Sequence, residues 1–432
     1  MNRTRRRSRA HDYWPVAGLV LTLVACGPSD TAPTAEWQAA YDTIGDTIVV
    51  RTLGGSVWGH TARLVADVTI GTFEGADEYM FGQVRSLAAA PDGSIYVYDS
   101  HAKELRKYAP DGTYVATFGR EGGGPGEYRQ PDGGLAVLPD GRVLLRDPGN
   151  SRISVFSPDG EYLDGWRIMG GVHTSRRLYV DTASNCYTLV FLNPEADFGE
   201  WRFGLLRMGP DGLASDTLPA PLWDYEPAEV VATSDDGQGI NMNEVPFTPV
   251  VSWAFSPLGY MVGGLPTRYA FGLFIAPDRV LRIEREDWTP VHVLPAEKEE
   301  QERIITAELR QVDPAWRWNA DPIPDRKPPY TRIHTGDRGR IWVHLSQEAV
   351  HIESEETEDT RPGQTPPQTW IEPVVFDVFE PDGRHLGIVR APEGFVTDPQ
   401  PVMRGDTVWA VVRGELDVPY IMRLHIEHRS QT

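Results

Sequence analysis

The sequence Leu87-Ala88-Ala89-Ala90-Pro91-Asp92-Gly93 decides the fold, because it returns 48 residues later as Leu135-Ala136-Val137-Leu138-Pro139-Asp140-Gly141. The residues that follow repeat in the same step. Asp99, Pro110-Asp111-Gly112, Tyr114 and Phe118 correspond to Asp147, Pro158-Asp159-Gly160, Tyr162 and Trp166. A period of about 40 to 50 residues is typical of stacked supersecondary units, since one such unit cannot bury its apolar faces alone.

Each copy contains four short stretches rich in Val, Ile, Tyr and Phe, which favour β-strands. In the first copy they are residues 87–90, 94–99, 105–108 and 113–118. Pro-Asp-Gly turns separate the first stretch from the second and the third from the fourth. Four antiparallel strands in this length of chain predict one blade of a β-propeller.

Further copies follow with lower fidelity, at residues 178–218, from residue 253, at residues 339–383 and from residue 401. The last copy is one strand short, and Thr69-Ile70-Gly71 near the start of the chain matches the fourth strand Thr117-Phe118-Gly119. We therefore predict an all-β fold over residues 44–428: a six-bladed β-propeller of four-stranded antiparallel blades, closed by an N-terminal strand that completes the last blade. Such closure removes exposed sheet edges. Residues 47–52 predict another strand beside this closure.

The second copy also carries a family resemblance. Leu145-Arg146-Asp147-Pro148-Gly149-Asn150-Ser151-Arg152-Ile153-Ser154-Val155-Phe156-Ser157-Pro158-Asp159-Gly160 looks like an NHL repeat, and the chain after residue 25 resembles the six-bladed β-propeller lipoproteins of Gram-negative bacteria. The resemblance implies six blades and a membrane-anchored location. It implies no single function, because NHL-like propellers include binding modules, sensor domains and enzymes.

The first residues resemble an export signal. Five arginines precede a short apolar run, residues 16–25, which is about half of the ~20 residues that a membrane-spanning helix needs. Leu23-Val24-Ala25-Cys26 resembles a bacterial lipobox, which implies a signal peptide over residues 1–25 and a lipid on Cys26; a plain secretory peptide is the alternative. Residues 26–43 predict a flexible tether. We expect a lipid anchor in the cell envelope, on the periplasmic or surface side of the outer membrane.

Charge and cysteine content limit the partners. Removal of residues 1–25 takes away five Arg and one Asp, so the net charge changes from −21 to −25. So acidic a protein repels phosphate backbones, which argues against a nucleic-acid partner. Beyond Cys26 only Cys186 remains, and we expect it to be a small core residue. The chain therefore depends on its core and not on disulfides, and we expect a monomer.

Strand order predicts which face of the propeller carries function. Turns between strands one and two and between strands three and four share one face, whereas the other turns and the blade-to-blade crossings share the opposite face. Three long insertions, about residues 219–250, 295–330 and 347–370, fall on that opposite face. Long loops on a rigid scaffold often bind ligands. The alternative is that they brace the ring.

The second insertion predicts a helix and an aromatic cluster. Pro295 followed by Glu297, Glu299 and Glu300 favours a helix start, with acids at the positive end of the helix dipole. Beyond it, Trp316, Trp318 and Tyr330 could stack on a peptide or glycan, or could anchor the loop onto the scaffold. Residues 353–367 are acidic and rich in proline, which predicts a disordered loop tip.

The crossing loop at residues 120–129 holds two further candidate ligand-binding residues, Tyr128 and Arg129, although tight crossing between blades explains its glycines equally well. In the repeat itself we interpret four polar residues as structural, because short polar side chains pin turns: Asp99, Asp147, Asn150 and Arg152.

The sequence contains no catalytic motif and no metal-ligand spacing that we can assign. No cofactor is expected, although calcium is possible: lactonase-like propellers bind calcium in the central channel, but no segment matches their motifs. Two functions remain. The favoured one is a non-catalytic binding or scaffold module whose peptide, glycan or protein partner meets the insertion-bearing face. The alternative is a calcium- or zinc-dependent hydrolase or lyase with its site in the central channel.

Overall fold

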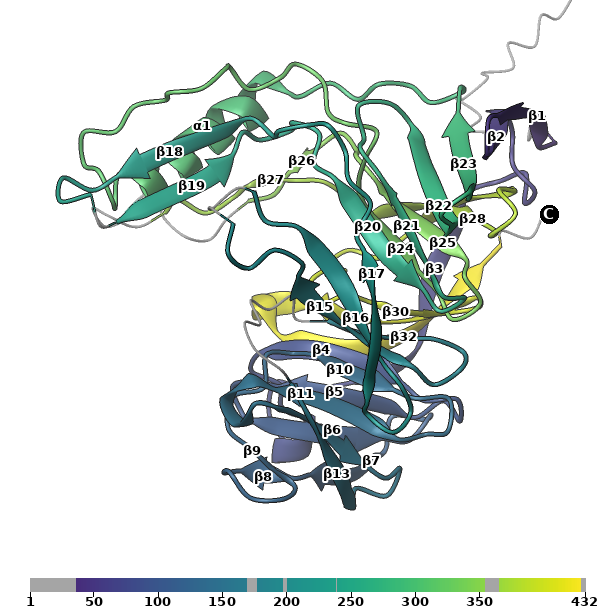
Figure 1. Ribbon diagram of the computed structural model, residues 1–432. Helices are drawn as coiled ribbons and strands as arrows, with labels where there is room; N and C mark the ends of the chain where they lie inside the picture. The colour runs from purple at the N-terminus through teal and green to yellow at the C-terminus, as the bar shows by residue number, and fades with distance from the viewer. Residues whose placement is uncertain (1–35, 169–176, 197–199, 238, 354–364, 429–432) are drawn as a thin grey trace, which may run out of the picture. The chain divides into compact units, whose positions relative to one another are not determined.

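The computed structural model describes residues 36–168, 177–196, 200–237, 239–353 and 365–428, and residues 35–432 form one compact unit. The described chain is nearly all β, with a single α-helix (Figure 1). The prediction of a β-propeller-like, all-β fold with one inserted helix is therefore confirmed. The predicted signal peptide, the lipidation residue Cys26 and most of the predicted loop tip, residues 354–364, lie outside the described residues.

The two copies of the repeat form two four-stranded antiparallel sheets, as predicted. The first consists of β4 (Val84–Ala89), β5 (Ile95–Asp99), β6 (Glu104–Tyr108) and β7 (Tyr114–Phe118). The second consists of β10 (Leu135–Val137), β11 (Val143–Asp147), β12 (Arg152–Phe156) and β13 (Tyr162–Arg167). Between them, β8 (Arg120–Glu121) and β9 (Glu127–Tyr128) form a short parallel pair in the crossing loop.

The third sheet has the same order, with β14 (Leu178–Val180), β15 (Cys186–Phe191), β16 (Phe203–Met208) and β17 (Ala214–Pro219). The next sheet has six strands in the order β1-β2-β23-β22-β21-β20. Their bounds are β20 (Ser252–Ser256), β21 (Tyr260–Gly264), β22 (Ala270–Ala276), β23 (Arg279–Arg285), β1 (Gln38–Ile44) and β2 (Thr47–Gly54).

The strands β1 and β2 correct two expectations. Residues 38–43 are not tether, because β1 pairs with β2 over this stretch. The predicted strand at residues 47–52 exists, but it does not lie beside the closure of the ring. Instead β2 pairs in parallel with β23, from Thr47 opposite Val280 to Thr52 opposite Arg285. The apolar residues of β2 explain the difference, since Val49 and Val50 are buried.

The last sheet has eight strands, in the order β24-β25-β28-β29-β3-β32-β31-β30. Their bounds are β24 (Tyr330–Thr335), β25 (Ile341–Leu345), β28 (Val375–Phe379), β29 (His385–Arg390), β30 (Val402–Arg404), β31 (Thr407–Arg413), β32 (Pro419–Glu427) and β3 (Ala62–Ile70). The N-terminal strand β3 pairs antiparallel with β32 over its length and in parallel with β29 at two residues only.

Contacts between sheets explain two features of the repeat: the large apolar residue at the end of its fourth strand and the glycine of its second turn. The large residue of one sheet packs against the glycine of the next sheet. Phe118, at the end of β7, lies where a Cβ atom on Gly160 of the next sheet would come within 2.9 Å of its ring. Trp166 lies in the same way against Gly212. Ile70 of β3 lies against Gly112 in the same way. The strand β3 therefore packs on the sheet β4–β7 as β7 packs on the sheet β10–β13. The apolar core accordingly sits between neighbouring sheets.

The three insertions fold together, and we call them the insertion module. It contains β18 (Glu229–Thr233), β19 (Ile240–Glu244), α1 (Pro295–Leu309), β26 (Val350–His351) and β27 (Trp370–Ile371), which lie together in Figure 1. Its own apolar cluster joins Val230 and Ala232 of β18 to Ile305 and Leu309 of α1 and to residues of the segment after the helix, such as Trp316. The predicted helix start at Pro295 is confirmed.

Candidate functional site

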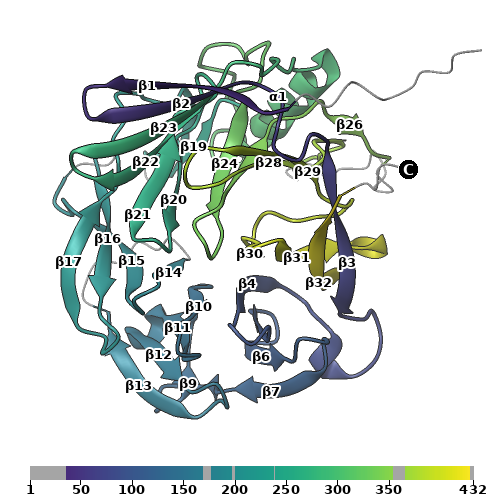
Figure 2. The same ribbon diagram turned by 90° about the vertical axis from the view of Figure 1, so that its right-hand side faces the viewer.

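A cavity of about 580 Å³ lies where the first strands of the sheets meet. It is lined by β4, β10, β14 and β30 and by the ends of β20 and β24, and Figure 2 shows the sheets following one another around this region. Hydrogen bonds link neighbouring sheets around it. The backbone N–H of Thr182 donates to the carbonyl of Pro257, and that of Asp337 donates to the carbonyl of Met403. The Arg404 side chain donates to the carbonyl of Ala90. The cavity is therefore the central channel of the propeller-like fold.

The two ends of the channel are chemically different, and chain direction identifies them. Residues at or before the start of a first strand lie on the side of the crossings and insertions, which we call the insertion-side end. Residues at or after the end of a first strand lie on the side of the Pro-Asp-Gly turns, the turn-side end. The insertion-side end carries Arg85, Arg177, Asp398 and Gln400, and the turn-side end carries Asp181, Asp337 and Arg404.

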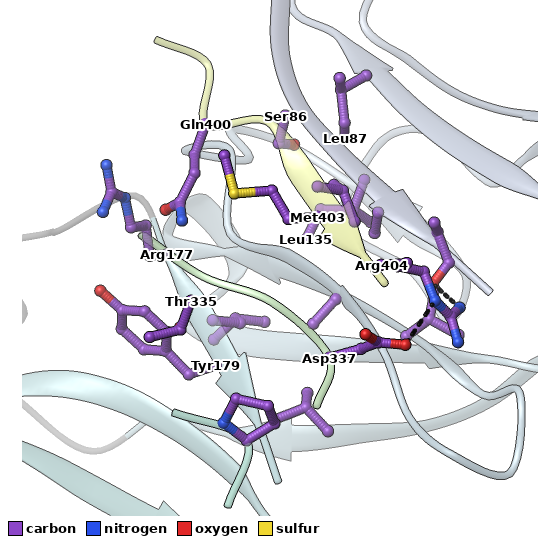
Figure 3. Close-up of a pocket in the computed structure, with 18 of the residues that line it drawn as sticks. Ser86, Leu87, Leu135, Arg177, Tyr179, Thr335, Asp337, Gln400, Met403 and Arg404 are labelled. Carbon is purple, nitrogen blue, oxygen red and sulfur yellow. Dashed lines mark hydrogen bonds and ion pairs between the residues drawn. The ribbon is translucent and has the colours of Figure 1, made fainter. Parts of the chain in front are cut away.

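At the turn-side end the charged groups bind one another or the backbone. Asp181 accepts hydrogen bonds from the Asn185 amide at 2.7 Å and the Tyr187 hydroxyl at 2.9 Å. Asp337 accepts a hydrogen bond from the backbone of Gly405 at 3.0 Å and lies 3.5 Å from the Arg404 guanidinium. Figure 3 shows the Asp337 and Arg404 side chains facing each other. This end therefore has little unsatisfied charge.

At the insertion-side end the charge is mainly positive. Figure 3 shows Arg177, Gln400 and Tyr179 gathered on one side of the cavity. Arg177 is close enough to Arg332, on β24, that it adds to the effect of burial in lowering the pKa of Arg332, while Asp398 opposes that shift. Among the described residues no carboxylate lies within ion-pair distance of Arg85 or Arg177. The end can therefore accept an anion.

Two histidines lie behind these arginines. His334 is fully buried, and neither ring nitrogen has a hydrogen-bond partner among the described residues. Burial lowers the pKa of His334 well below its usual value, and His344, Arg177 and Arg332 lower it further. Burial also lowers the pKa of His344 to about 4, with a contribution from Arg332. Both rings are therefore neutral at pH 7 and add no positive charge to the channel.

The predicted aromatic candidates do not come together as one site. Trp316 is 4% exposed, and its indole N–H donates to the carbonyl of Val231 at 2.9 Å. Trp318 lies beside it, with ring centroids 6.3 Å apart, and donates to the carbonyl of Asp321. The Trp316 hydrogen bond attaches the second insertion to β18, which belongs to the first insertion and not to the propeller-like scaffold that the anchoring alternative named. Trp316 has no exposed face for a peptide or glycan.

The other three candidates are also separate. Tyr330 is fully buried and donates its hydroxyl hydrogen to the carbonyl of Ala270 at 2.8 Å. Tyr128 is 1% exposed, and its hydroxyl accepts from the backbone N–H of Leu105 at 3.2 Å. Arg129 is exposed in the crossing loop, outside the lining of the channel. Burial removes Tyr128 and Tyr330 as contacts for a ligand, because both rings fill space between sheets.

The four polar residues of the repeat hold the crossing loops. Asp147 accepts from the backbone N–H groups of Arg129 and Gln130, at 3.0 and 2.8 Å. Asn150 donates to Asp147 and to the carbonyl of Gly122, and Arg152 donates to the carbonyls of Gly124 and Glu127. Asp99 makes the corresponding bonds to the backbone of Gly82 and Gln83. Each such residue fixes the chain that enters its sheet.

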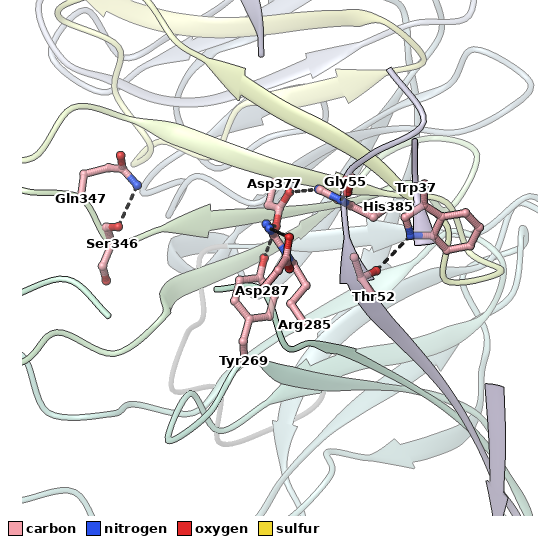
Figure 4. A network of polar contacts seen from close by, with 10 residues as sticks. All are labelled: Trp37, Thr52, Gly55, Tyr269, Arg285, Asp287, Ser346, Gln347, Asp377 and His385. Atoms are coloured by element: carbon pink, nitrogen blue, oxygen red, sulfur yellow. Dashed lines mark hydrogen bonds and ion pairs between the residues drawn. The ribbon is translucent and has the colours of Figure 1, made fainter. Parts of the chain in front are cut away.

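A second polar network lies between the six-stranded and eight-stranded sheets (Figure 4). Asp377 is fully buried and binds the Tyr269 hydroxyl at 2.6 Å, the Arg285 guanidinium at 2.5 Å and Nε2 of His385. Nδ1 of His385 lies 2.9 Å from the carbonyl oxygen of Gly55. Both neighbours of the ring, the Asp377 carboxylate and the Gly55 carbonyl oxygen, are hydrogen-bond acceptors. The network ties the segment after β2 to β28 and β29.

We find no metal centre in the part of the chain that the structure describes. No group of three or more His, Cys, Asp or Glu residues there is arranged to hold a metal ion. The three carboxylates of the channel lie at opposite ends and do not converge. Cys186 is buried, and burial raises the pKa of its thiol to about 12, so the residue is part of the core.

Arg85, Arg177 and Gln400 were missed by sequence reasoning. They stand at the start of first strands, where the repeat has no fixed residue: Arg85 corresponds to Gly133 in the second copy. The first copy has an arginine where the second copy has a glycine, at the start of a strand that faces the channel. This difference between the copies could have identified Arg85. Arg177 and Gln400 belong to copies whose match to the repeat is too weak for such alignment.

No protein-family model and no curated protein sequence matches the chain. Solved structures with a similar fold include a member of the DUF4221 family from Bacteroides vulgatus, at 9% identity and a TM-score of 0.49, covering 85% of this chain and 99% of that one. A gluconolactonase from Xanthomonas campestris has 12% identity and a TM-score of 0.36, covering 85% and 95%. Virginiamycin B lyase from Staphylococcus aureus has 10% identity and a TM-score of 0.36, covering 79% and 94%. No functional assignment rests on these likenesses.

The described part of the chain contains no helix with the length and apolar character needed to cross a membrane.

Proposed function

We propose that this protein is a six-bladed β-propeller, anchored by a lipid on Cys26 in the bacterial cell envelope, that binds a ligand in its central channel without chemical conversion. The observation that carries this proposal is the channel itself, a cavity of about 580 Å³ lined by first strands from every side of the ring. This volume falls within the ~300 to 1,000 Å³ of typical ligand sites.

The blade count follows from a division of the eight-stranded sheet. Its strands β24, β25, β28 and β29 form one blade, and β30, β31, β32 and β3 form the next, because β29 and β3 share only two paired positions. Together with the sheets that begin at β4, β10, β14 and β20, this division supports the proposed count of six blades. The contact of Ile70 with Gly112 supports β3 as a fourth strand, since Phe118 makes the same contact with Gly160.

Binding is favoured over catalysis by the residues that line the channel. The described lining contains no His and no Cys, and two of its three carboxylates, Asp181 and Asp337, are engaged by neighbours. A hydrolytic centre needs convergent groups for a metal or for acid–base chemistry, and the lining offers arginines and an amide at one end instead. These groups bind and orient a ligand.

The channel is favoured over the surface of the insertion module. Trp316 and Trp318 already donate their indole N–H groups to backbone carbonyls inside the module. The first two insertions share an apolar cluster, and Glu300 of α1 accepts hydrogen bonds from the backbone of Thr369 and Trp370 in the third. The module stands on the same side as the insertion-side end of the channel, because all three insertions leave the sheets at that side. We propose that it shapes the approach to the channel and does not hold the partner along its own surface.

A neutral fluorescent probe tests the channel as a binding site. The chain from Gly27 to Thr432 contains every described contact, so it can be studied without lipid or detergent. We expect N-phenyl-1-naphthylamine to bind saturably at one site per chain. Gln400→Trp, which fills the insertion-side end, should abolish binding, whereas Arg279→Trp, at an exposed position at the start of β23, should not.

Two results would overturn the proposal. One is the absence of saturable binding, or equal binding by the wild type and Gln400→Trp. The other is stoichiometric calcium or zinc in the purified protein by mass spectrometry, because a resident metal would favour the hydrolase or lyase alternative.

A further inference from the structure

We propose that the channel ligand is a small organic anion with an apolar body. Its acid group, a carboxylate or a phosphate, binds between Arg85 and Arg177 at the insertion-side end. Its apolar body lies against Leu87, Leu135 and Met403. The inference rests on the proposed function, since it names the chemistry of the ligand at the same site. All five residues line the one cavity.

The first support is the local excess of positive charge. The chain has 62 acidic and 41 basic residues, so a randomly chosen patch of its surface is acidic. The insertion-side end reverses this balance, with Arg85 and Arg177 in the lining and Arg332 close behind. Asp398 is the one carboxylate of the described lining at this end, and it is exposed.

The second support is the state of the two guanidinium groups. Nε of Arg85 donates to the Ser100 hydroxyl at 3.3 Å, and Arg177 lies beside the Tyr179 hydroxyl. Neither has an ion-pair partner among the described residues, in contrast to Arg404 at the other end, which has Asp337. Each guanidinium carries five N–H donors in a planar fork, so most of its donors remain for a ligand.

Neutral polar groups complete the end of the channel. Gln400 and Tyr179 lie beside Arg177 in Figure 3, and Ser86 contributes a buried hydroxyl with no partner among the described residues. Such groups can bind the remaining oxygens of an acid group without cancelling the charge of the arginines. An acidic partner is therefore matched in both charge and hydrogen-bond capacity.

The rest of the lining fixes the orientation and the apolar character of the ligand. Leu135 and Met403 lie between Arg177 and Arg404 in Figure 3, and Leu87 lines the same cavity. At the turn-side end the pair of Arg404 and Asp337 leaves no free cation. The acid group consequently points to the insertion-side end, and the apolar part of the ligand fills the middle of the channel.

The test compares two probes of similar shape on the chain from Gly27 to Thr432. One is the sulfonate 8-anilino-1-naphthalenesulfonate, and the other is the neutral N-phenyl-1-naphthylamine. We expect the sulfonate to bind at least tenfold more tightly. Arg85→Met and Arg177→Met should each weaken the sulfonate roughly tenfold or more, the loss expected for a hydrogen bond to a charged group. The control Arg279→Met changes an exposed arginine of β23 and should change neither affinity.

The neutral probe keeps the outcomes distinct. If it still binds Arg177→Met, the channel is folded and any loss of sulfonate binding is due to charge. Equal affinity of the two probes, or unchanged sulfonate binding in both arginine variants, would overturn the inference and leave the channel as a binding site. Failure of both probes to bind the wild type would overturn the proposed function as well.

Competition identifies the acid group. Octanoate and octyl phosphate share an apolar chain with octanol, which has no charge. We expect at least one of the two acids to displace the sulfonate at a concentration tenfold below that of octanol. The acid that displaces the sulfonate at the lower concentration shows whether the site prefers carboxylate or phosphate. Displacement by all three at the same concentration would contradict an anion site.

Discussion

The ammonium group of Lys327 lies 2.5 Å from a carboxylate oxygen of Glu297, and both side chains are buried, at 0% and 2% exposure. The same ammonium contacts Glu372 at 2.8 Å and the carbonyl of Gln347 at 2.9 Å, and it stands 5.0 Å from the ring centroid of Phe247. Phe247 belongs to the first insertion, Glu297 to the second, and Gln347 and Glu372 flank the third. One cation therefore joins all three insertions.

Lys327→Met should destabilise the protein strongly, because it leaves Glu297 buried without a counter-charge. We expect the free energy of unfolding to fall by about 3 to 5 kcal/mol, the cost of breaking a buried ion pair. Urea unfolding of the chain from Gly27 measures it. Lys298→Met is the matched control, since its partner Asp325 is 91% exposed, and it should cost at most about 1 kcal/mol. An equal decrease in the free energy of unfolding in the two variants would contradict a buried ion pair between Lys327 and Glu297.

Asp377 should stabilise the fold in a pH-dependent way. Burial alone would raise the pKa of Asp377, but the neighbouring His385 and Arg285 lower it well below its usual value. A carboxyl with a lowered pKa contributes its full stabilisation above the pKa of the unfolded chain, about 3.9, and loses it as the pH falls below that value. Asp377→Asn should therefore cost about 3 kcal/mol at pH 7, and the difference from the wild type should shrink below about pH 4.

The matched control for Asp377→Asn is Asp382→Asn, because Asp382 is exposed beside Arg384. It should change the free energy of unfolding by at most about 1 kcal/mol at pH 7. A difference between wild type and Asp377→Asn that stays constant from pH 7 to pH 3 would show that the carboxylate is not held by the cations around it.

His344 should also lower stability in acid, but in a higher pH range than Asp377. Burial lowers the pKa of His344 from 6.5 to about 4, so between these values the unfolded chain binds a proton that the folded chain does not. Stability is unaffected above about pH 6.5 and falls towards pH 4, by about 3 kcal/mol in total from this residue. His344→Gln should remove that part of the loss when unfolding is measured across this range. A native-state titration of His344 near pH 6.5 by NMR would contradict the prediction.

Cys26 should decide where the protein is found. A multi-chain lipid on this residue, at about 0.8 kcal/mol per buried CH₂ group, would hold the protein on a membrane. Cys26→Ala should release the protein into the soluble fraction after cell lysis and fractionation. Membrane association equal to that of the wild type would rule out lipidation at Cys26 as the anchor.

The repeat at residues 87–166 predicted the sheets well because its determinants are local. Pro-Asp-Gly turns fix strand ends, and apolar residues such as Phe118 must match a glycine one unit later, so the pattern reports both strand order and sheet contacts. The same strand order correctly predicted that β3 would pair beside β32. It could not predict the partner of β2, because pairing with β23 depends on which sheet edge is open in three dimensions.

The site was harder to predict because its residues come from weakly repeated positions. Trp316 and Tyr330 were candidate ligand contacts in the sequence. Both are buried in the structure, where their rings fill space between elements. Arg85 and Arg177 lie 92 residues apart in the sequence and line one cavity only because the ring brings first strands together. No local pattern contains that relationship.

Protection of a single thiol tests the central claim most directly, since the only native cysteine of the chain from Gly27, Cys186, is buried with a raised pKa and should not react. Cysteine is introduced at Gln400 in the channel or, as the control, at Arg279 on β23, and maleimide labelling is followed by peptide mass spectrometry. We predict that saturating 8-anilino-1-naphthalenesulfonate slows labelling of Gln400→Cys at least tenfold and leaves Arg279→Cys unchanged. Equal labelling of Gln400→Cys with and without the bound probe would contradict ligand binding in the channel.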